Sequence, residues 1–94
     1  FPYKEKDDID LVVQTYHSEY YIQIETGKSN IKKNIETLLK QKSDNLLMIA
    51  TNKDAEVKIR NILSTIAIPG KEKVQVWFIK DFISSNPIAH SHPN

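Results

Sequence analysis

A run of five apolar residues, Leu46–Ala50, constrains the fold of this chain more than any other stretch. The run has the length of a strand, and no polar residue alternates within it. Such runs are typical of strands covered on both faces, as in α/β sheets whose parallel strands are joined by helices. The sequence therefore predicts a buried central strand with a helix before it and a helix after it.

Both flanking segments have the apolar spacing of amphipathic helices. The first predicted helix follows an N-cap at Ser29 or Asn30 and runs to about Lys42. The second follows an N-cap at Asn52 or Asp54. Their apolar positions are Ile31, Ile35, Leu38 and Leu39 in the first helix, and Ala55, Ile59, Ile62, Leu63 and Ile66 in the second.

The remaining predicted elements lie outside this helix–strand–helix segment. Two strands, over residues 9–16 and 19–25, form a β-hairpin after an irregular lead-in over residues 1–8. A further strand covers residues 74–79, a short helix begins near residue 82, and residues 84–94 form a loose tail. The prediction is thus a single α/β domain over residues 1–94, with a mixed sheet in which the hairpin is followed by α-β-α-β.

The hairpin contains two carboxylates whose separation depends on the strand register. If His17 and Ser18 form a two-residue turn, Asp10 lies directly opposite Glu25, with Cβ atoms roughly 5 Å apart. A three-residue loop would place the two carboxylates on opposite faces of the sheet. In the first register we expect Ile9 to share a face with the other odd-numbered apolar residues of its strand.

Composition limits the classes of function. The chain has 94 residues, no cysteine and a net charge of +1, which excludes thiolate metal sites and a strongly basic nucleic-acid-binding module. No apolar run is long enough to span a membrane, so we expect no membrane partner and a cytoplasmic location. Because the chain starts at Phe1 rather than Met, we expect it to be a piece of a larger protein.

Asp10, Glu25 and Lys28 together carry a resemblance to a known family. Their order, followed by a helix and then strand–helix–strand, resembles the PD-(D/E)xK nuclease superfamily, the restriction-endonuclease-like fold that includes archaeal Holliday-junction resolvases. In that family an Asp on one hairpin strand and an acid on the next hold a divalent metal, and a lysine two residues after the acid orients water. Here Gly27 occupies that lysine position if Glu25 is the acid. If Gln23 occupies the acid position, Glu25 stands where the lysine belongs.

The resemblance implies a metal-dependent DNA nuclease within a larger DNA-processing protein. Asp10 and Glu25 would hold Mg²⁺ or Mn²⁺, and Lys28 and Gln23 would help to position water and phosphate. DNA would be contacted by Lys28, Ser29, Lys32 and Lys33, within a wider set of lysines around the first helix that also includes Lys40 and Lys42. Trp77, in the last strand, belongs either to the core or to a homodimer interface.

Two other interpretations remain open. The carboxylates can be hydrophilic surface residues, with Glu25 paired to Lys28, and the lysines can be the solvated face of an amphipathic helix. In that case the protein is a catalytically inactive member of the same fold that binds DNA or docks a protein, or an unrelated α/β interaction domain.

Overall fold

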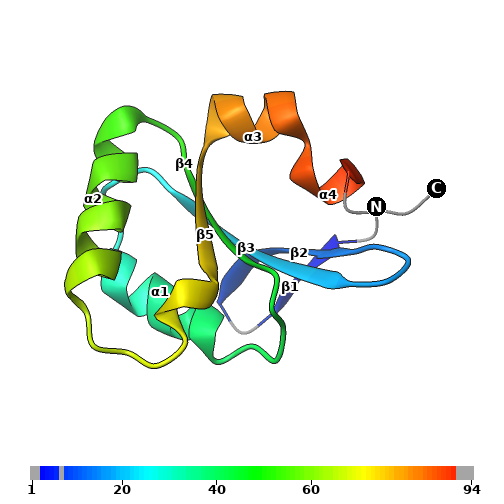
Figure 1. Ribbon diagram of the computed structural model, residues 1–94, viewed down its shortest axis with the longest axis horizontal. Helices are drawn as coiled ribbons and strands as arrows, with labels where there is room; N and C mark the ends of the chain where they lie inside the picture. The colour runs from blue at the N-terminus through cyan, green and yellow to red at the C-terminus, as the bar shows by residue number, and fades with distance from the viewer. Residues whose placement is uncertain (1–2, 7, 91–94) are drawn as a thin grey trace.

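The computed structural model describes residues 3–6 and 8–90 as a five-stranded sheet with helices on both faces (Figure 1). The strands lie in sequence order, β1-β2-β3-β4-β5. The first two pairings are antiparallel and the last two are parallel. The elements are β1 (Tyr3–Lys6), β2 (Ile9–Gln14), β3 (Glu19–Glu25), α1 (Ile31–Leu39), β4 (Leu46–Ala50), α2 (Lys53–Thr65), the 3-10 turn η1 (Lys71–Lys73), β5 (Val74–Phe78), α3 (Ile79–Ser85) and α4 (Pro87–His90).

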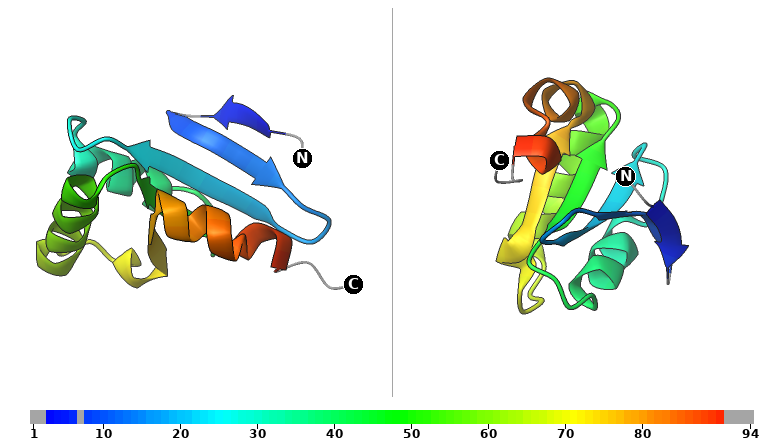
Figure 2. Two further views of the ribbon diagram at one scale, coloured as in Figure 1. Left: turned by 90° about the horizontal axis from the view of Figure 1, so that it is seen from above. Right: turned by 90° about the vertical axis from the view of Figure 1, so that its right-hand side faces the viewer.

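The parallel strands β3, β4 and β5 follow one another across the sheet through the crossovers α1 and α2. Because both crossovers step in the same direction, they cover the same face of the sheet. Helices α3 and α4 lie across the opposite face (Figure 2). The result is the mixed α/β sheet that the element pattern predicts, with an N-terminal hairpin followed by α-β-α-β.

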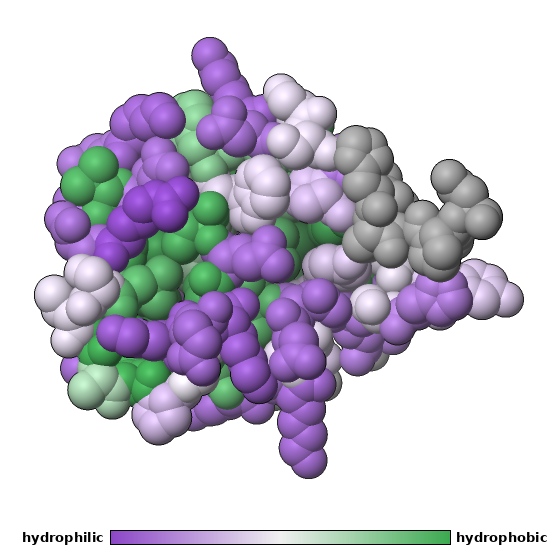
Figure 3. Space-filling model, viewed as in Figure 1, coloured by the Kyte–Doolittle hydropathy of each residue, from purple (hydrophilic) through white to green (hydrophobic). Residues whose placement is uncertain are grey.

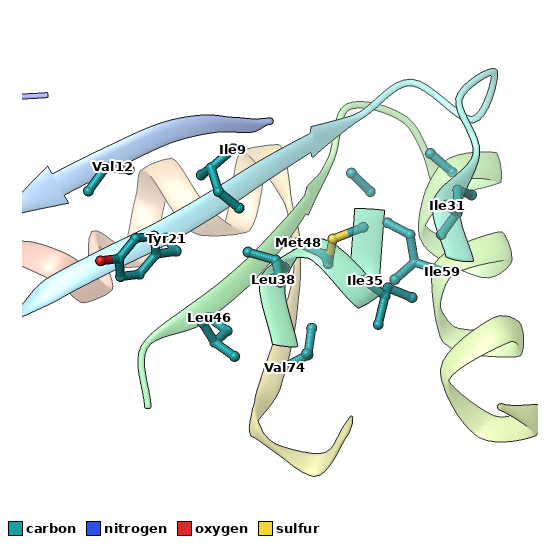
Figure 4. Packing of buried hydrophobic residues seen from close by; sticks show 12 residues of the cluster. Ile9, Val12, Tyr21, Ile31, Ile35, Leu38, Leu46, Met48, Ile59 and Val74 are labelled. Carbon is teal, nitrogen blue, oxygen red and sulfur yellow. The ribbon is translucent and has the colours of Figure 1, made fainter. Parts of the chain in front are cut away.

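Every residue of β4 is buried, because this strand has a packed cluster on each of its faces. Met48 and Leu46 point into the cluster under α1 and α2, which also contains Ile35 and Ile59 (Figure 4). Leu47 and Ile49 belong to the cluster on the opposite face, where Ile79 and Phe82 of α3 and the buried Ile88 of α4 pack. The prediction of a strand covered on both faces is confirmed.

The two crossover helices begin at asparagine caps. The Asn30 side chain accepts a hydrogen bond from the Lys33 amide at 3.1 Å, and the Asn52 side chain accepts one from the Ala55 amide at 2.8 Å. Both caps are among the predicted alternatives. Helix α1 ends at Leu39 rather than near Lys42, since the last turn closes with a tighter bond from the Gln41 amide to the Leu38 carbonyl.

The hairpin register differs from the predicted one. Gln14 lies opposite Glu19 and Val12 opposite Tyr21, so four residues, Thr15 to Ser18, form the loop instead of two. The Thr15 amide donates to the Ser18 carbonyl at 2.8 Å, and the Ser18 amide donates to the Thr15 hydroxyl at 3.1 Å. The prediction that Asp10 lies directly opposite Glu25 is therefore wrong.

A bulge in β2 changes a second part of the predicted pattern. Lys4 pairs with Val12 and Lys6 with Ile9, so an advance of two residues along β1 corresponds to three residues along β2. β2 therefore has one extra residue at this point. Ile9 and Val12 consequently reach the same cluster under α1, although simple alternation would place them on opposite faces. The expectation that Ile9 shares a face with the other odd-numbered apolar residues of β2 is wrong for this reason.

The ends of the chain contain more regular structure than expected. Residues 3–6 of the predicted irregular lead-in form the edge strand β1, and residues 1–2 and 7 lie outside the described residues. The predicted tail includes the end of α3 and the helix α4, whereas residues 91–94 are not described. In the part of the chain that the structure describes, no helix is both long and apolar enough to cross a membrane.

Candidate functional site

Glu25, the last residue of β3, is a fully buried carboxylate under α1. Its Oε2 accepts a hydrogen bond from Nδ2 of Asn34 in α1. Its Oε1 has no hydrogen-bond partner among residues 3–6 and 8–90. The interpretation of Glu25 as an exposed residue paired to Lys28 is therefore wrong. A buried carboxylate is costly unless both oxygens are satisfied, so an open oxygen at this position requires an explanation.

The backbone around Glu25 is held by the neighbouring strand and by α2. The Thr51 amide and hydroxyl both donate to the Glu25 carbonyl, at 3.0 and 3.1 Å. Asn52 Nδ2 donates to the Thr26 carbonyl at 3.1 Å, and Gly27 follows with a φ of 93°, a conformation that favours glycine. These bonds hold the turn at Gly27 against the N-terminus of α2. Glu25, the last residue of β3, therefore lies at the carboxyl edge of the parallel strands. Ligands of α/β sheets commonly bind at this edge.

Asp10 approaches the same part of β3 from the adjacent strand. Its side chain is exposed, and Oδ2 accepts a hydrogen bond from the Ile24 amide at 2.8 Å. One carboxylate oxygen therefore takes the place of a backbone carbonyl in the β2–β3 ladder. The Asp10 side chain thus contacts the backbone of Ile24, the residue before Glu25, although the two acids are not directly opposite one another.

Gln23 connects the two strands through both ends of its amide. Oε1 accepts from the Asp10 amide at 3.1 Å, and Nε2 donates to the Asp8 carbonyl at 3.0 Å. The side chain is 1% exposed, and Asp8 has a φ of 68°, in the left-handed region. The amide thus fastens the strained start of β2 to β3. The structure places Gln23 as a clamp on Asp10 rather than as an exposed side chain.

The predicted DNA-binding lysines do not form one strip. Lys32 lines a cleft between α1 and α2 with Ser29 and Lys58, whereas Lys33, Lys40 and Lys42 line a groove between α1 and the hairpin. That groove also contains the acidic residues Asp8, Glu19 and Glu36. Lys28 and Ser29 are exposed at the turn before α1, whose first turn contains no acidic residue. In the cleft on the α2 side Lys58 is paired with Asp54 at 3.1 Å, so among the residues that the structure describes the unpaired positive charge at this end of α1 comes from Lys28 and Lys32. A helix start of this kind favours an anion.

A divalent cation is compatible with the donor set. Within residues 3–6 and 8–90 there is no cluster of three or more carboxylate, imidazole or thiol ligands. Mg²⁺, however, is commonly held by one or two carboxylates together with waters and substrate phosphate. Glu25 Oε1 is buried and has no donor in the part of the chain that the structure describes, and Asp10 is an exposed carboxylate on the adjacent strand. In its chemistry, this pair of carboxylates on adjacent strands is a donor set of the kind that Mg²⁺ or Mn²⁺ accepts.

Sequence reasoning missed Asn34 as a member of this site. It lies in the turn of α1 between Ile31 and Ile35, so it borders the buried face of the helix. In the sequence, the one sign that Asn34 belongs to a site is its position beside the apolar face of α1. That pattern is also common in helices that bind no ligand. Comparisons with protein-family models, with curated proteins and with solved structures found no match to this chain.

Proposed function

We propose that this chain is a metal-dependent DNA phosphodiesterase domain of the PD-(D/E)xK type, and that it acts within a larger DNA-processing protein. The order of its elements supports this proposal: a hairpin is followed by a helix and then by strand–helix–strand. The resemblance of the sequence to that superfamily implies this order, and its restriction-endonuclease-like fold is part of the proposal.

The buried Oε1 of Glu25 is the observation that carries the proposal. A carboxylate that is removed from water and left with one open oxygen lowers the stability of the fold. A protein tolerates such a group when a bound ligand satisfies it, and a divalent cation is the ligand that matches a bare carboxylate oxygen. Asp10, bound to the backbone beside Glu25, adds the second negative charge that a divalent ion requires.

The residues of the site have distinct roles in this proposal. Glu25 and Asp10 would hold the cation, and Gln23 positions Asp10 through the Asp10 amide. When bound, Mg²⁺ or Mn²⁺ supplies a Lewis acid that activates water and stabilises charge on the scissile phosphate. Lys28, exposed on the turn that follows Glu25, places a positive charge where negative charge develops during phosphodiester cleavage.

DNA is held by the basic residues at the start of α1. Lys32 lies in the cleft on the α2 side beside Ser29, and Lys33 lies on the groove side of the same helix. Free backbone amides at a helix N-terminus and nearby lysines favour phosphate oxygens without reading the base sequence. Affinity should therefore fall as the salt concentration rises.

A second candidate, a catalytically inactive module of the same fold, has one observation in its favour. The Gln23 side chain is 1% exposed and each end of its amide already bonds the backbone of residue 8 or 10, so it presents almost no surface to a water or a phosphate. Such a module would keep the lysines and bind DNA or dock a protein partner without cutting.

Cleavage assays separate these two functions. The 94-residue chain is incubated with linear, single-stranded and branched DNA in Mg²⁺, in Mn²⁺ and in EDTA, beside Asp10→Asn, Glu25→Gln and the control Glu72→Gln. Glu72 is exposed in η1, which precedes the amino end of β5, at the opposite end of the parallel strands from Glu25. We expect metal-dependent cutting that falls by more than about 100-fold in the two site variants and is unchanged in the control.

Two results would contradict the nuclease proposal. If both site variants still cut DNA, the catalytic residues are not Asp10 and Glu25. A wild-type chain that binds DNA in a salt-dependent manner but does not cut it in either metal would favour the inactive module.

A further inference from the structure

Asn34 is the side chain that contacts the buried carboxylate, and the motif resemblance assigns it no role. It lies one turn into α1, where its amide nitrogen donates to the Asn30 carbonyl at 3.1 Å and its Nδ2 donates to Glu25 Oε2. The side chain is half-buried, between the buried residues Ile31 and Ile35 along the helix. Its contact with Glu25 joins α1 to the end of β3.

We propose that Asn34 is a positioning residue that holds Oε2 of Glu25 so that Oε1 remains open to a divalent cation. The identity of the ligand rests on the proposed function. The two oxygens of the carboxylate differ in their surroundings: one is anchored, and the other has no partner among the described residues. Anchoring one oxygen fixes the plane of the carboxylate and therefore the direction of the other.

An amide suits this role because of its charge. A lysine or arginine at the same position would neutralise the carboxylate and compete with a cation for it. The neutral Nδ2 of Asn34 donates a hydrogen bond without bringing a positive charge that would compete with a cation. Because Glu25 is fully buried, bulk water does not replace this donor when the side chain is removed.

The helix that positions Asn34 is held rigidly. Ile31 and Ile35, on either side of Asn34, are 5% and 0% exposed, and the helix start is fixed by the Asn30 cap. Figure 4 shows Ile31 and Ile35 of α1 packed among the residues of the cluster, toward Ile59 of α2. A donor on a packed helix holds its acceptor more accurately than a donor on a loop would.

The test measures cation binding rather than cleavage. Mn²⁺ affinity is determined by isothermal titration for the wild-type chain, Glu25→Gln, Asn34→Ala and the control Thr37→Ala, and the folded fraction of each is checked by circular dichroism. Thr37 lies one turn further along α1, is also half-buried, and donates only to the Lys33 carbonyl within the helix, at 3.0 Å. We expect the Asn34→Ala affinity to fall about 10- to 100-fold, as for other residues that orient a metal ligand, and the Thr37→Ala affinity to stay within about twofold.

Asn34→Asp keeps the shape of the side chain and tests the same idea if Asn34→Ala does not fold. It places a second carboxylate against Glu25, and like charges at this distance repel unless a cation lies between them. We expect the melting temperature of Asn34→Asp to be lower than that of the wild type in EDTA.

The outcomes distinguish this inference from the function on which it rests. Binding that is lost in Glu25→Gln and unchanged in a folded Asn34→Ala would overturn the positioning role and leave the cation site standing. An Asn34→Asp variant that melts at the wild-type temperature in EDTA would also overturn the positioning role, because it would mean that this side chain does not contact Glu25. A wild-type chain that binds no Mn²⁺, or a Glu25→Gln variant that binds it normally, would overturn both.

Discussion

Gln23→Glu is the substitution that most directly tests the clamp between β2 and β3. The amide of Gln23 uses its Oε1 to accept from the Asp10 amide and its Nε2 to donate to the Asp8 carbonyl. A carboxylate of the same shape keeps the first bond but cannot make the second. It also places a negative charge against a carbonyl oxygen, at a side chain that is 1% exposed.

The expected loss follows from these contacts. A neutral hydrogen bond contributes about 1 kcal/mol to stability, and a buried polar group left without a partner costs roughly 1–3 kcal/mol more. The free energy of unfolding should therefore fall by at least about 2 kcal/mol at neutral pH. For a domain of this size that loss lowers the melting temperature by roughly 8–16 °C.

Urea unfolding followed by circular dichroism, in EDTA, measures this difference. The control is Gln75→Glu, an exposed glutamine of β5 whose Oε1 accepts from the Trp77 indole at 3.1 Å, a bond that a carboxylate also accepts. We expect the control to change stability by less than about 0.5 kcal/mol. Near pH 5 the loss in Gln23→Glu should shrink, because a protonated carboxyl can donate to the Asp8 carbonyl as the amide does.

A Gln23→Glu variant as stable as the wild type in EDTA at neutral pH would refute the reasoning. It would mean that the start of β2 does not depend on this amide, and that Asp10 is held by its own bond to Ile24 alone.

Two further predictions concern α2, which holds the turn after Glu25. Asn52→Ala removes the cap bond to the Ala55 amide and the bond to the Thr26 carbonyl, so urea unfolding should show a loss of about 1–2 kcal/mol, and an unchanged stability would contradict the structure. Hydrogen bonds from Arg60 and then Lys53 hold the pKa of Glu56 below its usual value of 4.5. A carboxyl whose pKa is lowered by folding stabilises the fold above its unfolded-state pKa, and this contribution is lost as the pH falls through the lower folded-state value. Glu56→Gln should therefore make the acid side of the stability–pH curve shallower, as measured by melting temperature, whereas Glu72→Gln should leave it unchanged.

An exposed apolar residue on α2 does not by itself indicate a binding surface. Val57 is 56% exposed on this helix, and on the face seen in Figure 3 apolar side chains around α2 are interrupted by hydrophilic ones. Lys53 lies over the Phe78 ring at 4.2 Å and also pairs with Glu56, while Arg60 donates to the Val76 carbonyl at the open edge of β5. Charged side chains thus cover part of the apolar surface at this edge of the sheet.

The sequence by itself determined the elements whose pattern is local. Apolar periodicity and an asparagine cap were enough to place α1 and α2, because a helix and its first turn depend on residues within about four positions of one another. The unbroken apolar run Leu46–Ala50 was enough to predict a strand buried on both faces. The order of the elements from the hairpin to β5 was predicted in the same way, whereas the edge strand β1 and the helix α4 were not.

Only the tertiary structure decided how those acids are arranged. The register depends on the bonds between Thr15 and Ser18 that close a four-residue loop. Because this loop is two residues longer than predicted, Leu11 pairs with Ile22 and Asp10 is no longer directly opposite Glu25. The burial of Glu25 depends on α1 packing back over β3, a contact between two different elements that the periodicity of neither element specifies. Asn34 became part of the site through the same contact, because the local pattern of a helix specifies which face is buried but not which residue of another element that face meets.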